Sequence, residues 1–477
     1  MENSDNISQP LYNALEKLEG LKEIENEILE LKKTVAQPPR VVVVGRLKAG
    51  KSTLVNALIG KNVSQTAALE ATNVVTVFHD GPLARAIIHL CNGQIEEVFD
   101  RGNGVIVPRQ HSNEIEFVER WFQTNSLEEF SLIDTPGLST LTEENDSATR
   151  SALLDGYDET RKAAVDADAA IFLFDSKPRR DEMDFIRELG FTPFNAIGVL
   201  SRADSFGQGA LGELDPIESA KRQAALLSVD LAPYVLKVIP VAGLLAESSR
   251  TGTITEEFAL TLKAYSSVTD LDLLSRLHED SAISRIENAP LTRIVDTIGE
   301  YGLFRCGEQA RHGATSLRDW IDHRAGLGDL QKELTYSIGP FAKKHRALRV
   351  IEKIEQLAYL HPELSGQIRL ALSELSTSRA MSDVMLLQAL KSLSRFEPKS
   401  PLIPIMVRLG VGKTLEEKLG LPTPSPEQEI TREISRMDQW LKEFSFMGAS
   451  AEVRAAAKTV SRIYSEYISE LSPQKFY

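Results

Sequence analysis

The feature that constrains this chain most is an eight-residue glycine-rich segment near its start. The segment follows the pattern G-x-x-x-x-G-K-S and consists of Gly45, Arg46, Leu47, Lys48, Ala49, Gly50, Lys51 and Ser52. Four valines precede it and an apolar helical stretch over residues 53–59 follows it. This strand–loop–helix context is the one that a phosphate-binding loop requires. A chance match on an ordinary strand–turn–helix is the alternative, and the complete context argues against it.

The residue types in this segment suit the binding of a nucleoside triphosphate. Glycines let the backbone curl so that its N–H groups face the phosphates. We expect Lys51 to bring positive charge to the β- and γ-phosphates and Ser52 to bind Mg²⁺, with Thr53 next to them.

A second motif follows an apolar strand expected at residues 130–133. Asp134, Thr135, Pro136 and Gly137 form the pattern D-x-x-G. We expect Asp134 to hold Mg²⁺ through a water molecule and the Gly137 N–H to sense the γ-phosphate. An ordinary Pro-Gly turn is the alternative, but it does not explain an aspartate at the end of the strand.

A third motif indicates which base is bound. Ser201, Arg202 and Asp204 follow a strand expected at residues 197–200. A carboxylate can accept two hydrogen bonds from the N1–H and N2 amine of guanine, which adenine does not offer. The flat guanidinium of Arg202 can stack on the base. Ala242 is expected to direct a backbone N–H to guanine O6. The carboxylate of Asp204 predicts GTP as the substrate, with ATP as the alternative.

A GTPase also needs a threonine that closes on the metal ion. Thr72 is the candidate, since it lies in a polar segment just before an expected strand. Thr66 and Thr76 are the alternatives, and a simple helix or strand cap is the competing interpretation.

The pattern along the chain predicts three regions. Residues 1–38 contain one amphipathic helix, over residues 11–35, that we expect to pack on the helical region, against residues 427–471. Residues 39–275 alternate strands and helices, which predicts an α/β domain with a mostly parallel sheet and helices on both faces. Residues 276–477 are expected to form an elongated all-α bundle or stalk. Strands are expected at residues 41–44, 76–80 and 84–91 (a hairpin turning at Asp80-Gly81-Pro82), 130–133, 169–174, 196–200 and 235–240.

The composition bounds the partners and the compartment. The formal net charge of the 477 residues is −14, which argues against nucleic acid as a partner. The two cysteines, Cys91 and Cys306, lie far apart, as suits a reducing cytoplasm. The sequence has no apolar run of roughly 18 residues and no signal-peptide pattern at its start. We therefore expect a cytoplasmic protein whose membrane contact, if it has one, is peripheral at the inner face.

Together these motifs resemble the dynamin-like GTPases of bacteria. The matching segments are G-R-L-K-A-G-K-S, A-T-N-V-V-T-V with a β-hairpin after it, L-I-D-T-P-G-L and S-R-A-D. The Leu-Gly-rich stretch over residues 409–421 is similar to the tail of the isoniazid-inducible actinobacterial subgroup. The resemblance implies a homodimer formed through the GTPase faces, a second dynamin-like protein as partner, and work on membranes by a helical stalk. The alternative is a GTP-driven switch or scaffold that acts on proteins alone.

Leu47 and Lys48 depart from the pattern of eukaryotic dynamins, which carry Gln and Ser there. In those dynamins the Gln orients the attacking water, which Leu47 cannot do, and the Ser helps to hold a charge-compensating monovalent cation. Because Lys48 carries a positive charge itself, we expect it to replace that cation and supply the extra positive charge that phosphoryl transfer needs, in cis or across a dimer. A surface ion pair is the rival interpretation for Lys48.

Two segments of the helical region are candidates for a membrane-facing tip. One is the basic run of residues 343–346, and the other is the apolar stretch of residues 402–407 between prolines. Taken singly, a solvated helix face and a buried loop are the favoured interpretations.

Overall fold

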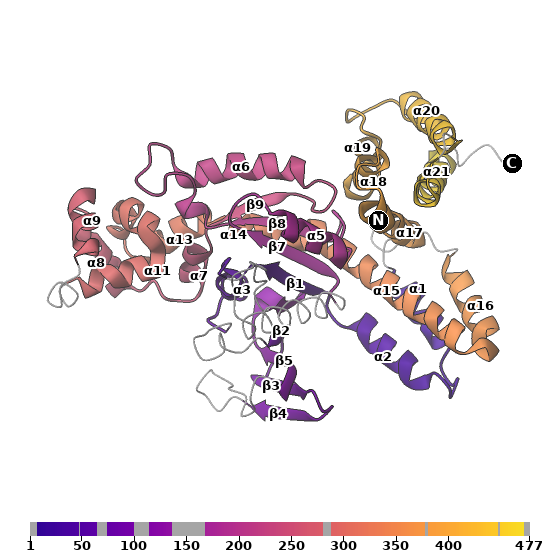
Figure 1. The fold of residues 1–477 in the computed structure, drawn as a ribbon, viewed down its shortest axis with the longest axis horizontal. Coiled ribbons are helices and arrows are strands. Elements are labelled where there is room, and N and C mark those ends of the chain that lie inside the picture. Colours follow the sequence, from indigo (N-terminus) through magenta and orange to yellow (C-terminus); the bar gives the residue numbers. More distant parts are fainter. Residues whose placement is uncertain are drawn as a thin grey trace.

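The computed structural model has a sheet-containing part and a helical part (Figure 1). None of its described helices is both long and apolar enough to span a bilayer. The structure describes residues 7–46, 48–63, 74–99, 114–135, 167–279, 288–376, 380–446 and 449–471.

The sheet has nine strands in the order β4-β3-β5-β2-β6-β1-β7-β8-β9. Strand β1 is central and pairs in parallel with β6 and β7, and β8 and β9 extend the parallel part. Its valines are almost fully buried because both faces of the sheet are covered. The strands are β1 (Arg40–Gly45), β2 (Val75–Asp80), β3 (Arg85–Leu90), β4 (Ile95–Phe99), β5 (Ile115–Phe122), β6 (Ser131–Asp134), β7 (Ala169–Phe174), β8 (Ala196–Ser201) and β9 (Val238–Val241). The expected α/β class is confirmed.

The expected hairpin between β2 and β3 is wrong in its pairing. The turn at Gly81 reverses the chain, but β5 lies between the two strands, parallel to β2 and antiparallel to β3. The antiparallel hairpin is instead formed by β3 and β4. A turn signal predicts where the chain reverses but not which strands pair. Here β5, which begins more than thirty residues after the turn, pairs with both β2 and β3.

The helices around the sheet share one hydrophobic core with it. This core continues past the expected domain boundary at residue 275 as far as Ala342, so the boundary does not coincide with a division of the core. Figure 1 shows α6 above the parallel strands and α3 below them. The helices are α3 (Lys51–Ile59), α5 (Arg180–Leu189), α6 (Pro216–Asp230), α7 (Gly243–Arg250), α8 (Glu256–Tyr265), α9 (Asp270–His278), α11 (Ala289–Arg305), α12 (Gly307–Ala310), α13 (Ala314–Arg324) and α14 (Leu327–Glu333), with short turns η2 (Asn125–Leu127) and η3 (Ala203–Ser205).

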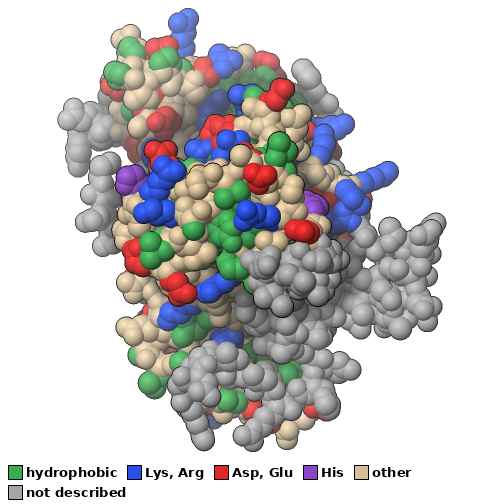
Figure 2. Space-filling view, turned by 90° about the vertical axis from the view of Figure 1, so that its left-hand side faces the viewer, with side chains coloured by type: hydrophobic (Ala, Val, Ile, Leu, Met, Phe, Trp, Pro, Cys, Tyr) green, Lys and Arg blue, Asp and Glu red, His purple; other side chains and the backbone are tan. Residues whose placement is uncertain are grey.

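Figure 2 shows the end of the molecule that lies on the left of Figure 1. Basic and acidic side chains alternate over its described surface, with small hydrophobic areas between them. The described part of this face is therefore mixed in charge.

A second hydrophobic core holds the helical part together. It contains both ends of the described chain. Its helices are α1 (Ser8–Glu16), α2 (Glu25–Ala36), α15 (Gly339–Leu360), α16 (Ser365–Ser376), α17 (Ala380–Phe396), α18 (Leu402–Val411), α19 (Leu415–Leu419), α20 (Glu427–Phe446) and α21 (Ala451–Leu471), with the short turn η5 (Pro362–Leu364).

The N-terminal region differs from the single helix expected over residues 11–35. It forms two helices, α1 and α2, because the chain turns between them at Gly20, whose φ of 82° is a left-handed conformation. The two helices pack on each other and on α15 and α16, as Figure 1 also shows. The expected partner, residues 427–471, is wrong: α20 and α21 bury their apolar stripes against each other and against α17, α18 and α19.

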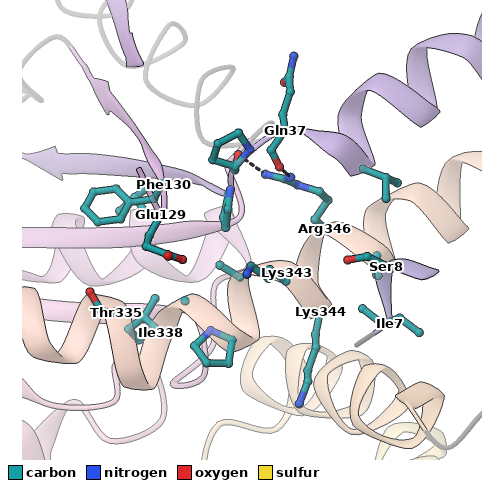
Figure 3. A pocket seen from close by; sticks show the side chains of 18 of the residues that line it. Ile7, Ser8, Gln37, Glu129, Phe130, Thr335, Ile338, Lys343, Lys344 and Arg346 are labelled. Atoms are coloured by element: carbon teal, nitrogen blue, oxygen red, sulfur yellow. Dashed lines mark hydrogen bonds between the residues drawn. The ribbon is translucent and has the colours of Figure 1, made fainter. Parts of the chain in front are cut away.

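A nearly continuous helical segment connects the two cores. It runs from α14 through the π-helical turn η4 (Leu334–Ile338) into α15. Beside η4 lies a cavity of about 660 Å³, lined by residues of α1, the segment between α2 and β1, the segment before β6, and α15. Figure 3 labels Lys343 and Glu129 among the residues that line this space. The cavity borders Val41 at the start of β1, whereas the phosphate-binding loop follows the end of that strand.

A buried ion cluster joins the sheet to α15. The carboxylate of Asp168 is fully buried and accepts from Arg346 Nη2 at 2.6 Å, from Arg349 Nη2 at 2.7 Å and from the Arg40 backbone N–H at 2.9 Å. Arg346 also donates to the carbonyls of Gln37 and Pro38 (Figure 3). Arg346 of α15 thus contacts both the residue before β7 and the segment that leads into β1.

An aromatic contact lies next to this cluster. Phe194, in the segment before β8, is buried in the core of the helical part and stacks on Phe341 of α15 with ring centroids 4.5 Å apart. Gly410 of α18 leaves room for the ring, because any side chain there would overlap it. Shape and charge together therefore fix the sheet against the helical part.

Both candidate membrane segments are largely buried, although Lys343 of the first and Pro404 of the second are exposed. In the basic run, Arg346 and His345 are buried, and Lys344 pairs with Asp383, so a membrane tip and a solvated helix face are both wrong for them. The apolar stretch forms the start of α18, where Leu402, Ile403 and Met406 are buried. For that stretch burial is confirmed, but the expected loop is wrong, because the segment is helical.

Candidate functional site

The glycine-rich segment lies where the sequence places it, between β1 and α3. Gly50 has a φ of 93°, which favours glycine, and it precedes the first residue of α3. At Gly45 a side-chain carbon would come within 2.7 Å of the Leu173 carbonyl on the neighbouring strand β7. Both glycines are thus required by the backbone. Leu47 lies outside the described residues.

Lys51 holds its amine over this loop. The side chain is 7% exposed, and Nζ donates to the carbonyls of Gly45 at 3.2 Å and Arg46 at 3.3 Å. Burial lowers the pKa of Lys51, and the nearby carboxylate of Asp134 opposes that shift. Lys51 is the first residue of α3. Its amine and the helix dipole therefore both favour the binding of an anion at this helix N-terminus.

Ser52 and Asp134 come together although they are far apart in sequence. Strand β6 pairs with β1 and places Asp134 beside α3, so that Ser52 Oγ lies 3.4 Å from Asp134 Oδ2. Thr135 Oγ1 donates to the Val43 carbonyl at 2.8 Å and fixes the end of β6. A hydroxyl and a carboxylate are ligands that suit Mg²⁺, so this pair fits the expected metal. Thr72, its alternative Thr66 and Gly137 lie outside the described residues, and Thr76 lies in β2.

The base-recognition segment is tied to the phosphate loop. Arg202 has a φ of 54° and donates from Nη2 to the Lys48 carbonyl at 2.7 Å, while Lys48 itself has a φ of 62°. Ser201 Oγ donates to the Phe174 carbonyl at 3.3 Å, which fastens the end of β8 to β7. Asp204 follows in η3, and burial raises the pKa of its carboxyl. Burial removes water from this carboxylate, so two hydrogen bonds from a guanine would stabilise its charged form strongly.

Ala242 does not offer a free donor in this structure. Its backbone N–H donates to the Ala325 carbonyl at 2.9 Å, so the expected contact with guanine O6 is not available from it. The cause is the close approach of α13 to the end of β9, where Gly326 fits against the Pro240 carbonyl without room for a side chain.

Sequence reasoning missed one neighbour of this site, Gly299 in α11. A side-chain carbon at that position would lie 3.3 Å from Asp204 Oδ2. The only signal in the sequence was a glycine within a helical run, about a hundred residues after Asp204. A glycine in a helical run does not predict which residue of another segment it will contact.

The comparisons with known proteins agree with this geometry. A sequence model described as Dynamin family matches residues 41–189. The isoniazid-induced protein IniC of Mycobacterium tuberculosis is 30% identical over 286 residues, which cover 56% of this chain and 56% of that protein. The bacterial dynamin-like protein of Nostoc punctiforme is 26% identical over 212 residues, which cover 41% of this chain and 29% of that protein. The match therefore spans little more than half of the first relative.

A solved structure aligns along nearly the whole chain. It is described as an oligomerised bacterial dynamin pair that provides a mechanism for the long-range sensing and tethering of membranes. Its identity to this chain is 14% and its TM-score is 0.31, with 99% of this chain and 75% of that chain covered.

Proposed function

We propose, from the dynamin-family GTPase domain that residues 41–189 carry, that this chain binds GTP with Mg²⁺ and hydrolyses it to GDP and phosphate. The observation that supports this most is the approach of Ser52 to Asp134 beside the buried amine of Lys51. In this proposal Lys51 binds the β- and γ-phosphates, Ser52 and Asp134 hold the metal ion, and Asp204 reads the base.

The metal ion would supply charge neutralisation between the β- and γ-phosphates. The chain's own contribution is positioning. Arg202 ties the base-recognition segment to the phosphate loop, so the base and the phosphates are held by one connected unit. Thr72 and Gly137 are the proposed residues that close on the metal ion and the γ-phosphate.

The test is the pair Lys51→Ala and Lys221→Ala. The first change removes the charge at the loop, so GTP binding and turnover should be lost. The second removes a lysine of α6 that is exposed and paired only with Glu218 among the described contacts, so both should be retained. Turnover at the wild-type level in Lys51→Ala would refute the site.

We further propose that GTP binding drives dimerisation through the GTPase domains and that the protein remodels or tethers membranes, peripherally at the cytoplasmic face. The dynamin-family domain supports this proposal, and so does the helical region that the ion cluster of Asp168 couples to the sheet. A GTP-driven switch or scaffold acting on proteins is the second candidate function. The ion cluster of Asp168, which connects the sheet to the helical part, is compatible with both candidates.

A further inference from the structure

Helix α11 is broken at Gly299. The helix runs over Ala289–Arg305, but Gly299 has a φ of 67° and a ψ of 178°, well outside helical values. Residues with a side chain rarely adopt this conformation, so the break depends on glycine. A break inside a packed helix costs hydrogen bonds, and its surroundings should explain it.

The broken turn faces the proposed base-reading carboxylate. A side-chain carbon at Gly299 would meet Asp204 Oδ2 at 3.3 Å and Leu244 Cδ2 at 3.8 Å. A contact of 3.3 Å is tighter than ordinary van der Waals contact, so the carboxylate would have to give way. Glycine at this position therefore leaves the carboxylate of Asp204 in place.

The chain on each side of the break is anchored to an element that follows a residue expected to contact the base, Ala242 before the break and Asp204 after it. Before the break, the Thr297 carbonyl accepts from Ser248 Oγ on α7, the helix that begins directly after Ala242. After it, Tyr301 donates to Asp215 Oδ2 at 3.0 Å and accepts from Arg324 Nε at 2.9 Å. Asp215 ends the loop that follows Asp204 and caps α6. In Figure 1 α11 accordingly lies beside α7 and α13.

We propose that Gly299 is a specificity-determining position of the base site, which holds the Asp204 carboxylate where it can accept from both the N1–H and the N2 amine of guanine. Gly299 acts through Asp204 and is a positioning residue. The inference rests on the proposed role of Asp204. Hydrogen bonds to a carboxylate weaken when the acceptor moves off line, so a displacement of a few tenths of an ångström reduces selectivity for the base more than affinity for the phosphates.

The test compares dissociation constants for GDP, IDP and ADP. Inosine lacks the N2 amine of guanosine, so IDP makes one hydrogen bond fewer to Asp204. Gly299→Ala should therefore weaken GDP more than IDP and lower the IDP-to-GDP ratio of dissociation constants by about tenfold, the effect of one charge-assisted hydrogen bond. ADP, which makes neither hydrogen bond, should bind as it does to the wild type.

Gly313→Ala is a matched control. Gly313 has a φ of 92°, and a side-chain carbon there would also come within 3.3 Å of a carboxylate oxygen, that of Glu256. The backbone strain and the crowding of a carboxylate are thus alike, but Glu256 begins α8 and caps α13 instead of facing the base. Gly313→Ala should leave the ratio unchanged.

Ser248→Ala serves as a second variant, which keeps every glycine and removes the donor to the Thr297 carbonyl. It should lower the same ratio by a smaller factor. An unchanged ratio in folded Gly299→Ala, an equal fall in Gly313→Ala, or, if Gly299→Ala does not fold, an unchanged ratio in Ser248→Ala would each overturn the inference. A wild-type protein that binds ADP as tightly as GDP would instead refute the proposed guanine site.

Discussion

At the scale of single residues, the backbone around the phosphate loop has unusual conformations at two residues that carry side chains. Lys48 and Arg202 both have positive φ, and the hydrogen bond from Arg202 to the Lys48 carbonyl joins them. Such conformations cost of order 1–3 kcal/mol each and persist only where the surroundings determine them. The Lys48 backbone is thus held in place, while its side chain is exposed.

This arrangement bears on the proposed role of Lys48 as an additional cation. A positive charge supplied to the transition state is worth roughly 10³–10⁵ in rate. Even a small part of that effect is measurable, so Lys48→Ser should lower kcat by about tenfold or more with little change in GTP affinity, and Lys48→Arg should retain most of the rate. Wild-type turnover should not change when potassium is replaced by a bulky cation. Full activity in Lys48→Ser, or strong potassium dependence in the native protein, would favour a simple surface ion pair.

At the scale of elements, the joint between β7 and α15 depends on one buried carboxylate. Burial alone would raise the pKa of Asp168, but the charges of Arg346 and Arg349 lower it below its ordinary value. A carboxyl with a depressed pKa in the folded state stabilises the protein above its unfolded pKa of about 3.9. That contribution is lost as the pH falls through the lower, folded value. His345, next to it, stays neutral, since burial lowers its pKa to about 3.

Removing this carboxylate leaves two buried guanidinium groups without their partner. We expect Asp168→Ala to lower the free energy of unfolding by about 3–5 kcal/mol. Asp329→Ala is the control, because its partner Lys332 is 4.0 Å away and both side chains are more than 70% exposed. That change should cost less than about 1 kcal/mol. Denaturant unfolding measures both, and equal effects would show that the Asp168 cluster does not hold the joint.

The elements that the sequence predicted share a strong local pattern. Strands β1, β7 and β8 are continuous apolar runs, and the phosphate loop is a contiguous motif, so each could be recognised without its neighbours. Strand β4 is short and mostly exposed, so it has no buried apolar run to mark it, and the alternation of buried and exposed residues in β5 could be interpreted only once its neighbours were known. The break at Gly20 and the contact of Gly299 with Asp204 likewise depend on packing between distant segments.

At the scale of the whole molecule, the membrane proposal needs a surface other than the two segments first considered, since most of their charged and apolar side chains are buried or paired inside the protein. The end of α15 offers Tyr359 and Leu360, which are 86% and 67% exposed. Exposed apolar side chains at the end of a helix can enter the headgroup region of a bilayer.

We expect the protein to float with anionic liposomes in at least one nucleotide state, and Tyr359→Ser with Leu360→Ser to weaken that binding. The control pair is Leu226→Ser with Val229→Ser on α6, which is similarly exposed and should have no effect. Failure of the native protein to float in any nucleotide state would favour the switch or scaffold.

The most direct test of the account is the nucleotide preference of wild type and Asp204→Asn. An asparagine loses an acceptor for the N2 amine of guanine and can donate to the C2 carbonyl of xanthine. Turnover of GTP, ATP and XTP should be measured side by side with Mg²⁺ present. We predict that the wild type prefers GTP and that Asp204→Asn loses that preference while gaining activity with XTP. An unchanged preference for GTP over ATP in Asp204→Asn, or equal use of GTP and ATP by the wild type, would contradict the account.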